Sequence, residues 1–514
     1  MPQFTDPDDD KDLMQITLNS DPITQIQTEA LVTYVFEKDD RIDGVLAELD
    51  AATGGRLKTL AESGELAGKP LEMTLLHYPG GLAAQRLLIV GAGKPEKFAL
   101  AELRRLGGAA LRFLKARSVK RFVFVPREND RTAAAAQAIT EGLMIGAMDS
   151  DKYKTEKKNG NKEIEAVQLA GWEAARAAEA EQGIARGHVV AESQNFTRDL
   201  VNEPSNRLTP RVLADRAQAM ARECGLGVDI LDEDRIRELK MGALLSVAQG
   251  SEEPPRLIVV TYDPPQPPAA GAPVVGLVGK AITFDTGGIS IKPSEGMEKM
   301  KYDMAGGATM LGVMRAIAHL KPPIKVIAVI PATENMPGGR AQKPGDVQIA
   351  LSGKSIEVIN TDAEGRLILA DGIAYAKQLG ATHLVDAATL TGAIVVALAN
   401  VNVGVFGNQP AYADRLLASA RNAGEKMWPM PLDDDYREMI KSTIADIQNV
   451  GSGKGGGAIT AAMFLKEFAE ETPWIHLDIA GTAWLDEQKP WMAKGASGVA
   501  VRTLVDLVMG FHPA

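Results

Sequence analysis

The chain has 514 residues, of which 45% are hydrophobic and 24% charged, and its formal net charge is -11 at pH 7. This length allows roughly two or three domains, and the composition is that of a globular protein with a sizeable core. The acidic balance, to which "DPDDDKD" near the start contributes, argues against non-specific binding to nucleic acid or an anionic membrane, because both need a cationic surface. A local basic patch is still compatible with this composition.

The cysteine content and the N-terminal sequence predict a soluble cytoplasmic protein. Cys224 is the single cysteine, so an intrachain disulfide is excluded, as in proteins of reducing compartments. The first twenty residues have no basic region followed by an apolar run, which a secretory signal requires. The segment that comes closest to a membrane span, "GAIVVALANVNVGVFG", is shorter than about 18 residues and is interrupted by glycine.

The first block alternates segments typical of strands and helices, and we expect an N-terminal α/β domain over residues 1–170. Three segments, "EALVTYVFE", "RLLIVGAG" and "RFVFVP", are rich in β-branched or aromatic residues and predict strands. Between them, "LAELRRLGGAALRFLKAR" has apolar residues at helical spacing. This alternation predicts a mostly parallel sheet.

A surface loop and a long helix are expected next. The lysine-rich, glycine-marked stretch "DKYKTEKKNGNKE" at 151–163 predicts the loop. The alanine-rich segment that follows predicts a linker helix over 171–204, with an interruption considered near Gly183 and Gly187. The stretch "EPSNRLTP" ends this helix with two prolines.

The α/β alternation resumes in a C-terminal block, expected to be a catalytic domain over residues 205–514. The strand candidates are "RLIVVTYD", "PVVGLVGKAITFD", "IKVIAVIPATE", "SIEVINTD", "HLVDAATLTG" and "WIHLDIAG". The helix candidates are "PRVLADRAQAMARECG", "GATMLGVMRAIAHL", "RLILADGIAYAKQLG" and "AAMFLKEFAEE". The expected fold class is therefore two α/β domains joined by a long helix, the larger with a mixed, mainly parallel central sheet.

Several familiar catalytic motifs are absent from the sequence. "LSGKS" resembles the end of a phosphate-binding loop, but Gln348 stands where its first glycine is required. "GAGKPEKF" lacks the spacing of a dinucleotide fingerprint, and no G-x-S-x-G nucleophile elbow occurs. The six histidines are scattered and form no H-E-x-x-H pair, which argues against a histidine-ligated zinc site.

Three clusters of charged residues in the C-terminal block point instead to a carboxylate site. "GKAITFDTGGISIKP" contains Lys280, Asp285 and Lys292, "MKYDMAGGA" contains Asp303, and "NTDAEGRLILADG" contains Asp362, Glu364 and Arg366. Each cluster lies at or just after a predicted strand end, where functional groups of open α/β sheets gather. Asp362 and Glu364, two positions apart, would point to one side of an extended segment.

Two interpretations of these clusters stay open on physical grounds. Each acidic residue alone is typical of a solvated turn or of a helix N-terminus, which favours carboxylates. Brought together, four carboxylates would repel strongly unless cations neutralised them, and two divalent metals about 3.5–4 Å apart would do so. Oxygen ligands suit Mn²⁺ and Mg²⁺, and Zn²⁺ accepts them.

These three motifs closely resemble those of the leucyl aminopeptidases, metallopeptidases with two metal ions. "DAATLTGA" and "HLDIAG" also match, in the family's order and at compatible spacing, so that the resemblance covers residues 190–510. It implies a hydrolase that releases N-terminal residues, preferentially leucine and other apolar ones, from peptides with a free N-terminus. It further implies a homohexamer built as a dimer of trimers.

The resemblance also implies individual roles. Lys280, Asp285, Asp303, Asp362 and Glu364 would bind two Mn²⁺ or Zn²⁺ ions, Asp285 and Glu364 bridging both, and a bridging hydroxide would attack the peptide bond. Lys292 would stabilise the oxyanion, and Arg366 would hold a bicarbonate that acts as general base. The residues expected to contact the substrate or the bicarbonate are Met300, Thr389, Leu390, Gly392 and Ala480.

Two rival functions are also compatible with parts of this sequence. A two-metal phosphohydrolase also uses clustered carboxylates, but it does not need Lys280 as a ligand. A binding or structural protein that retains the fold, such as a DNA-associated hexamer, is the alternative from another class. Retention of every expected ligand argues against a loss of catalysis, while a second binding role remains compatible with it.

Overall fold

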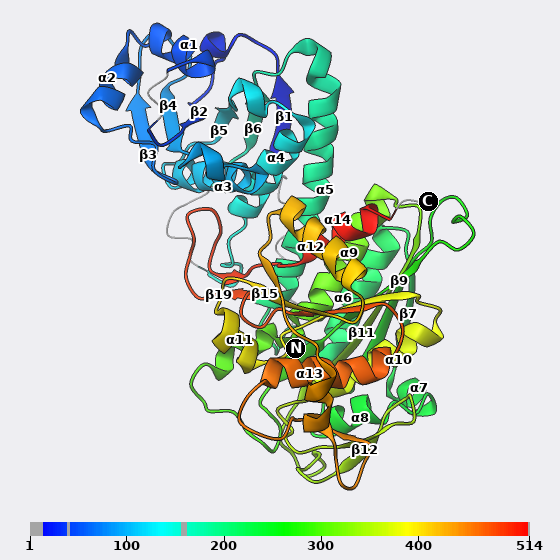
Figure 1. Cartoon of the computed structure of the whole chain (residues 1–514). Coiled ribbons are helices and arrows are strands. Elements are labelled where there is room, and N and C mark those ends of the chain that lie inside the picture. Colours follow the sequence, from blue (N-terminus) through cyan, green and yellow to red (C-terminus); the bar gives the residue numbers. More distant parts are fainter. Residues whose placement is uncertain (1–13, 39–41, 156–161, 512–514) are drawn as a thin grey trace. The chain divides into compact units, whose positions relative to one another are not determined.

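The computed structural model describes residues 14–38, 42–155 and 162–511 (Figure 1). The acidic stretch at 6–12 and part of the predicted surface loop, residues 156–161, lie outside the described residues. The chain divides into two compact units, one formed by Met1–Glu192 with Glu487–Ala493 and the other by Ser193–Asp486 with Lys494–Ala514. Helix α5 (Ala177–Asn202) contributes residues to both.

Within its described residues, the first unit contains a six-stranded sheet in the order β1-β6-β5-β2-β4-β3. All neighbouring strands are parallel except β3, which pairs with β4 in the antiparallel direction. The strands are β1 (Gln15–Asn19), β2 (Ala30–Val35), β3 (Met73–His77), β4 (Arg86–Gly91), β5 (Arg121–Phe124) and β6 (Ala166–Ala170).

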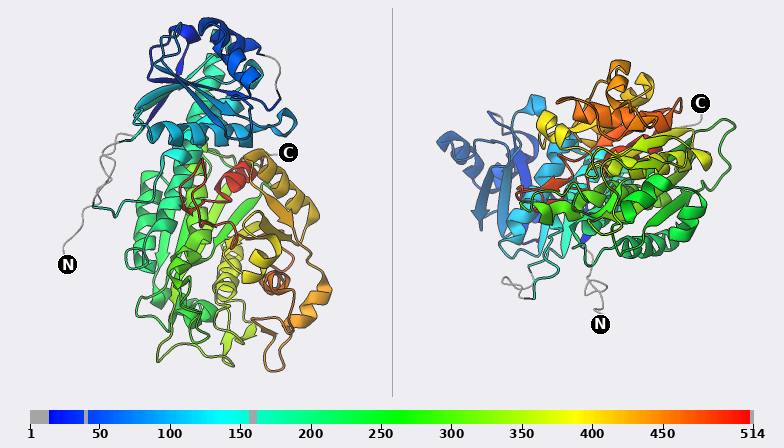
Figure 2. Two further views of the ribbon diagram at one scale, coloured as in Figure 1. Left: turned by 90° about the vertical axis from the view of Figure 1, so that its left-hand side faces the viewer. Right: turned by 90° about the horizontal axis from the view of Figure 1, so that it is seen from below.

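Helices cover both faces of this sheet (Figure 2), and the side chains of β2 show why. Val32 and Tyr34 belong to the core cluster that includes α3 and α4, whereas Leu31 and Val35 belong to the cluster that includes α1 and α2. Successive side chains of a strand point to opposite faces, so a strand buried on both sides is apolar throughout. These helices are α1 (Gly44–Ala52), α2 (Arg56–Ser63), α3 (Leu100–Lys115) and α4 (Ala133–Ala147).

Helix α5 runs without interruption through Gly183 and Gly187, where the sequence suggests a break. A Cβ on Gly183 would lie 2.2 Å from the carbonyl oxygen of Ala133, and one on Gly187 would lie 2.7 Å from that of Gln137. Both carbonyls belong to α4, so the glycines let α4 and α5 pack backbone against backbone. The interruption does not occur, because glycine inside a helix costs only about 1 kcal/mol relative to alanine.

The described part of the second unit contains a nine-stranded sheet in the order β16-β15-β18-β14-β9-β11-β8-β7, with β10 also pairing with β11. Most neighbours are parallel, while the β15–β18, β11–β8 and β7–β8 pairs are antiparallel. The strands are β7 (Gly227–Leu231), β8 (Arg256–Tyr262), β9 (Val274–Gly279), β10 (Ala281–Asp285), β11 (Lys325–Asn335), β14 (His383–Ala388), β15 (Val403–Gly407), β16 (Met427–Pro429) and β18 (Trp474–Asp478).

Two layers of helices bury the central strands of this sheet. Helices α8, α10 and α13 share a core with residues of β8, β9, β11 and β14, and α9 packs on the other side against β9, β11 and β14 (Figure 1). The helices are α6 (Pro210–Glu223), α7 (Glu233–Glu238), α8 (Gly242–Ala248), α9 (Ala305–Leu320), α10 (Gly365–Gln378), α11 (Gly392–Leu398), α12 (Pro410–Ala423), α13 (Gly457–Ala469) and α14 (Val501–Met509). The predicted fold class is confirmed, including the mixed and mainly parallel sheet.

Small sheets and irregular segments complete the second unit. Strands β12 (Val347–Ile349), β13 (Ser355–Glu357) and β17 (Ile447–Gln448) form one small sheet, and β19 (Trp484–Leu485) pairs with β20 (Gly495–Ala496). The predicted strand "SIEVINTD" ends at Glu357, and "PVVGLVGKAITFD" divides into β9 and β10 on either side of Lys280. Among the described residues, no helix is both long and apolar enough to cross a bilayer.

Candidate active site

Lys280 stands at the break between β9 and β10, and the backbone there is fixed by its neighbours. Its N–H donates to the carbonyl of Ala387 at 3.1 Å, and its own carbonyl accepts from the N–H of Gly307 at 2.7 Å. These bonds tie the break to β14 on one side and to α9 on the other. The regular strand pairing is therefore interrupted at Lys280, whose side chain enters the site.

The glycine pair after Asp303 explains how this carboxylate reaches the same place. Asp303 lies in a 3-10 segment, η5 (Met297–Met304), which leads directly into α9. A Cβ on Gly306 would lie 2.0 Å from the carbonyl oxygen of Ala387, and one on Gly307 would lie 2.8 Å from Cβ of Ala281. Only glycine allows the start of α9 to approach the strands so closely, and this approach brings Asp303 to the strand ends.

The segment that carries Asp362 and Glu364 is a turn, not the extended strand expected from the sequence. Glu364 is the N-cap of α10 and has helical torsions, with φ -78° and ψ -34°. The two side chains consequently meet different partners, Lys292 for Asp362 and Lys280 for Glu364. The predicted extended segment is absent here, because the strand has already ended at Glu357, although both side chains line the same cavity.

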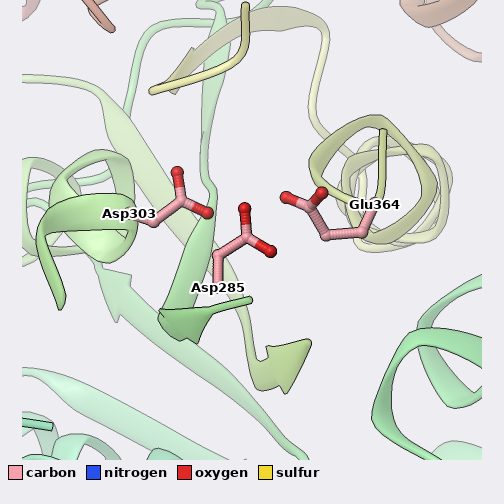
Figure 3. A group of neighbouring side chains, drawn as sticks. All are labelled: Asp285, Asp303 and Glu364. Atoms are coloured by element: carbon pink, nitrogen blue, oxygen red, sulfur yellow. The ribbon is translucent and has the colours of Figure 1, made fainter. Parts of the chain in front are cut away.

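Three carboxylates from three different segments converge (Figure 3): Asp285 at the end of β10, Asp303 before α9 and Glu364 at the start of α10. One oxygen of each lies within 4.8 Å of the others, and all three side chains are buried. Lys280 Nζ lies 2.8 Å from both Asp303 Oδ2 and Glu364 Oε1, and it donates to the carbonyl of Thr389 at 2.9 Å.

Asp362 belongs to the same charge cluster through Lys292. Lys292 Nζ lies 2.8 Å from Asp285 Oδ2 and also contacts Asp362 Oδ1. Asp362 is more exposed than the other three acids, with 30% of its side chain accessible. The predicted ligands and Lys292 thus form one connected group, in which four carboxylates face two ammonium groups.

The electrostatics of this group favour a further positive charge. Burial raises the pKa of Glu364, and the nearby carboxylate of Asp285 raises it further. Burial likewise raises the pKa of Asp303. For Lys280 burial lowers the pKa, but the carboxylates of Asp303, Glu364 and Asp285 outweigh burial and raise it overall. Two ammonium groups leave a formal excess of two negative charges (4 - 2 = 2), which cations would neutralise.

The donor set fits divalent metals. Glu364 Oε2 is buried and has no hydrogen-bond partner among the described residues. Asp303 Oδ2 and Glu364 Oε1 lie close enough to Lys280 for an ion pair, but not at hydrogen-bond geometry, and so retain free lone pairs. Buried carboxylates are normally hydrogen-bonded, paired or metal-bound. Hard oxygen donors of this kind suit Mn²⁺, Mg²⁺ and Zn²⁺.

Arg366 lies in the first turn of α10, almost fully buried. One of its terminal nitrogens donates to the carbonyl of Asn449 at 2.7 Å, while Nε is buried without a partner among the described residues. Burial lowers the pKa of Arg366 to about 10, and the group stays cationic at neutral pH. A guanidinium with an unused donor is suited to hold a small anion.

A cavity of about 310 Å³ opens onto the carboxylate group. All five predicted ligands and Lys292 line it, and so do the five residues predicted to contact substrate or bicarbonate. Arg366 is not among the lining residues. The residues brought together are Lys280, Asp285, Lys292, Met300, Asp303, Asp362, Glu364, Thr389, Leu390, Gly392 and Ala480.

Several residues at the site were not predicted from the sequence. Tyr302 and Val395 line the cavity, and Val395 extends its apolar part. Asp478 ties two loops of the cavity together, since it accepts from the N–H groups of Leu390 and Ala480, each at 3.2 Å, and from Thr391 Oγ1 at 2.7 Å. The one available signal for Asp478 was its position inside "HLDIAG" at a predicted strand end.

Cys224 takes no part in this group. It ends α6 and is half-buried, with Sγ 3.7 Å from Nε2 of His319. Burial raises the pKa of its thiol, which is the opposite of what an activated nucleophile requires.

Comparison with protein families gives a match over both parts of the chain. Residues 195–505 match the catalytic domain of the cytosol aminopeptidase family, and residues 32–157 match the N-terminal domain of that family. Together they cover well over half of the chain.

Individual proteins agree over nearly their whole length. A probable cytosol aminopeptidase of Solibacter usitatus is 58% identical over 496 residues, which is 96% of this chain and 99% of that protein. A structure of a lysine-to-glutamate mutant of tomato leucine aminopeptidase is 34% identical and superposes with a TM-score of 0.88, covering 98% of this chain and 97% of that one. The bottromycin maturation enzyme BotP in complex with Mn is 31% identical, with a TM-score of 0.82 over 94% of this chain and 99% of that one.

Proposed function

The chain belongs to the cytosol aminopeptidase family and is a metallo-aminopeptidase. We propose the following roles for the residues of its site. Lys280, Asp285, Asp303, Asp362 and Glu364 hold two divalent metal ions, Mn²⁺ or Zn²⁺. The convergence of Asp285, Asp303 and Glu364 within 4.8 Å is the observation that carries this proposal. The Mn-bound relative supports manganese as one of the ions.

Metal ions bound in this way lower the pKa of water and polarise the carbonyl of a peptide. Asp285 and Glu364 would be among the carboxylates that hold these ions, and each is paired with a different lysine, Asp285 with Lys292 and Glu364 with Lys280. Lys280 would have to release its proton to act as a ligand, because an ammonium group has no lone pair and is repelled by a dication. The contacts of its Nζ with two carboxylates and a carbonyl hold that nitrogen in place.

Lys292 is proposed to act on the reacting atoms, whereas Arg366, which does not line the cavity, would act through an anion that it holds. Lys292 lines the cavity with its Nζ 2.8 Å from Asp285 Oδ2, and its positive charge would stabilise a tetrahedral oxyanion. Burial lowers the pKa of Lys292, but the carboxylates of Asp285, Glu364 and Asp303 raise it by more, which keeps the ammonium protonated. Arg366, with its unused Nε, would hold a bicarbonate ion, which would supply a general base.

The cavity wall supports a preference for apolar N-terminal residues, leucine among them. Met300, Thr389, Gly392 and Ala480 line it together with Val395, and Gly392 leaves open space where a side chain would stand. An apolar pocket separates substrates that differ by one methylene by only about 1–3 kcal/mol. We therefore expect a broad preference.

Release of leucine from leucinamide and from a leucyl dipeptide tests the proposal. The purified protein is assayed as isolated, after chelation, and after addition of Mn²⁺ or Zn²⁺, with the N-acetylated dipeptide as control. We expect hydrolysis that chelation abolishes, that metal restores and that the acetylated peptide does not undergo. A metal-loaded protein that leaves every free N-terminus intact would contradict it, and hydrolysis of a phosphate ester in its place would favour the phosphohydrolase.

The assembly, the cellular location and the domain limits are also proposals. We propose a homohexamer in the cytoplasm, with residues 205–514 as the catalytic domain, 171–204 as the linker and 1–170 as the N-terminal domain. Exposed apolar side chains on the second unit, such as Val396 at 90% and Ile444 at 63%, support burial of part of this surface in an assembly. Light scattering during size-exclusion chromatography gives the mass, and a monomer at micromolar concentration would contradict the hexamer.

A further inference from the structure

The turn that carries Asp362 and Glu364 lies outside the helices and strands, so contacts with other segments must fix its conformation. Residues 358–364 belong to no helix or strand, yet two of the proposed ligands must keep their positions within this turn. Ligands of a metal site have to be held by surrounding side chains, since a carboxylate on a loose turn loses affinity for the metal. Two buried asparagines from distant parts of the chain contact the turn.

Asn449 follows β17 and is fully buried, and its side chain makes all of its contacts with the turn. Its oxygen accepts from the N–H groups of Ile359 at 2.8 Å and Asn360 at 3.3 Å. Its amide nitrogen donates to the carbonyls of Asn360 at 2.7 Å and Ala363 at 3.3 Å. Every donor and acceptor of the side chain is thereby used, and only one orientation of the amide satisfies these partners.

The backbone of Asn449 extends the same contact to the proposed anion site. Its carbonyl accepts from the guanidinium of Arg366 at 2.7 Å, and its N–H donates to the carbonyl of Glu357 at 2.9 Å. One residue therefore spans the segment from the end of β13 to the first turn of α10. Displacement of Asn449 would move Asp362, Glu364 and Arg366 together.

Asn335, the last residue of β11, connects the turn to the proposed ligand on the neighbouring strand. Its amide nitrogen donates to Asp285 Oδ1 at 2.8 Å and to the carbonyl of Thr361 at 3.1 Å. Asn335 is 2% exposed. Gly288 allows this arrangement, because it has φ +65° and a Cβ there would lie 2.8 Å from Asn335 Oδ1.

We propose that Asn449 and Asn335 are positioning residues that set the metal affinity of the site by fixing the turn of Asp362 and Glu364 against Asp285. This inference rests on the proposed function, because it requires that these carboxylates bind metal. Neither asparagine lines the cavity, so neither contacts the substrate. Asn335 acts through the carboxylate of Asp285 and the carbonyl of Thr361. Asn449 acts through the backbone next to Asp362 and Glu364.

Binding of Mn²⁺ to folded protein tests the inference directly. We would measure the Kd for Mn²⁺ by competition with a chelating dye for the wild type, Asn449→Ala, Asn449→Asp and Asn335→Ala, with thermal unfolding of each. Asn408→Ala is the matched control. The side chain of Asn408 makes three hydrogen bonds to backbone groups of the second unit, in Glu470, Thr472 and Trp474. Asn408 does not line the cavity.

We expect the Kd for Mn²⁺ to rise about 10- to 100-fold in the Asn449 and Asn335 variants, as for other residues that support metal ligands. The kcat should return toward the wild-type value at saturating Mn²⁺, because no group that touches the substrate is lost. Asn449→Asp keeps the oxygen acceptor but places an oxygen against two carbonyls, so it should bind no better than Asn449→Ala. Asn408→Ala should lower the Tm and leave the Kd unchanged.

The outcomes separate this inference from the proposed function. A wild type that binds no Mn²⁺ would mean that the proposed metal site itself is wrong. Tight Mn²⁺ binding by the wild type together with an unchanged Kd in folded variants would overturn the positioning role alone, whatever the change in Tm. If neither Asn449 variant folds, Asn335→Ala decides, because a wild-type Kd there overturns the inference.

Discussion

At the scale of single residues, the two lysines of the site do different work although both lie among carboxylates. Lys280 is 3% exposed and contacts Asp303 and Glu364, whereas Lys292 is 22% exposed and contacts Asp285 and Asp362 nearer the cavity mouth. A Cβ on Gly365 would lie 2.7 Å from Nζ of Lys280, so this glycine leaves the room that Lys280 occupies. Lys280 is thus the more closely packed of the two, and Lys292 is the more accessible to a substrate.

Replacement of Lys292 by alanine should lower kcat while metal binding persists. Removing one donor to a developing oxyanion costs about 10²- to 10³-fold in kcat. Loss of a positive charge beside Asp285 and Asp362 also removes repulsion toward a dication, so the Kd for Mn²⁺ should stay the same or fall. Steady-state kinetics at saturating Mn²⁺, with dye competition for the Kd, measure both.

Lys299→Ala provides the control for this substitution. Lys299 pairs with Asp486 at 2.6 Å, is 40% exposed and does not line the cavity. Its loss should leave kcat unchanged. A kcat of the Lys292 variant equal to that of the wild type would remove Lys292 from the proposed mechanism.

Asp371 in α10 predicts a dependence of stability on pH that is separate from the site. Burial raises the pKa of Asp371 to about 7, although its carboxylate accepts from the N–H groups of Leu351 at 2.7 Å and Leu244 at 2.8 Å. An unfolded aspartate has a pKa of about 3.9, so the folded state binds this proton more tightly than the unfolded state between the two values. The contribution of Asp371 to stability therefore falls as the pH rises from about 4 to 7.

Asp371→Asn removes this titration. The free energy of unfolding of the wild type should fall relative to that of the variant by up to about 1.4 kcal/mol per pH unit in that range. Urea unfolding of both proteins at several pH values measures the difference. A difference between the two proteins that is constant with pH would mean that Asp371 is already ionised throughout.

At the scale of elements, the site depends on how closely helices and loops approach the strand ends. The pair Gly306 and Gly307 brings α9 against the break at Lys280, and the turn before α10 is held by side chains from β11 and from the segment after β17. Asp478 fixes two loops that line the cavity, because it accepts hydrogen bonds from the loop after β14 and from the loop after β18. Each connection uses hydrogen bonds between segments distant in sequence.

Asp478→Ala should weaken substrate binding more than the chemical step. Three donors, the N–H groups of Leu390 and Ala480 and the hydroxyl of Thr391, would lose a buried acceptor, at about 1–3 kcal/mol each. The two loops line the substrate pocket but carry none of the proposed ligands. We expect KM for leucinamide to rise at least tenfold with a smaller change in kcat and an unchanged Kd for Mn²⁺.

Kinetics at saturating Mn²⁺ check this expectation, with Thr391→Ser as a variant that keeps the hydroxyl donor and should behave as the wild type does. A large fall in kcat with constant KM would place Asp478 in the chemistry itself.

At the scale of the whole molecule, the charge cluster couples metal binding to folding. Four carboxylates and two ammonium groups are gathered by β10, η5 and the start of α10, and they come together only in the folded second unit. A ligand that binds only the folded state stabilises it by RT ln(1 + [L]/Kd), about 2.7 kcal/mol at a hundred times Kd. Removal of metal should therefore lower the stability of this unit.

Chelation is expected to lower the Tm of the second unit by several degrees, and Mn²⁺ should restore it in proportion to the logarithm of its concentration. Differential scanning calorimetry of chelated and reloaded protein measures the shift. The first unit has no group of three ligating side chains among its described residues and should unfold independently of metal. Equal shifts in both transitions, or none in either, would contradict the coupling.

The sequence by itself determined much of the fold and most of the chemistry. Strands β2, β4, β8, β11 and β14 and helices α3, α6, α9 and α10 lie where hydrophobic periodicity predicted them, because that period records which side chains must be buried. The short motifs around Lys280, Asp303 and Glu364 supplied the candidate ligands, since unusual local combinations of acids, lysines and glycines can be recognised in the sequence alone. Glycines misled the prediction for α5, because the sequence does not tell a helix break from a close helix contact.

The tertiary structure alone decided which of those residues meet and what holds them. Asn335 and Asn449 give no local signal and Asp478 gives only its position inside "HLDIAG", because an asparagine or aspartate at a strand end is ordinary in sequence and becomes informative only through partners 26 to 90 positions away. The turn of Asp362 and Glu364 likewise takes its shape from those partners and not from local strand propensity. Side chains converge because distant segments pack together. The spacing of those segments along the chain does not indicate which of them will be in contact.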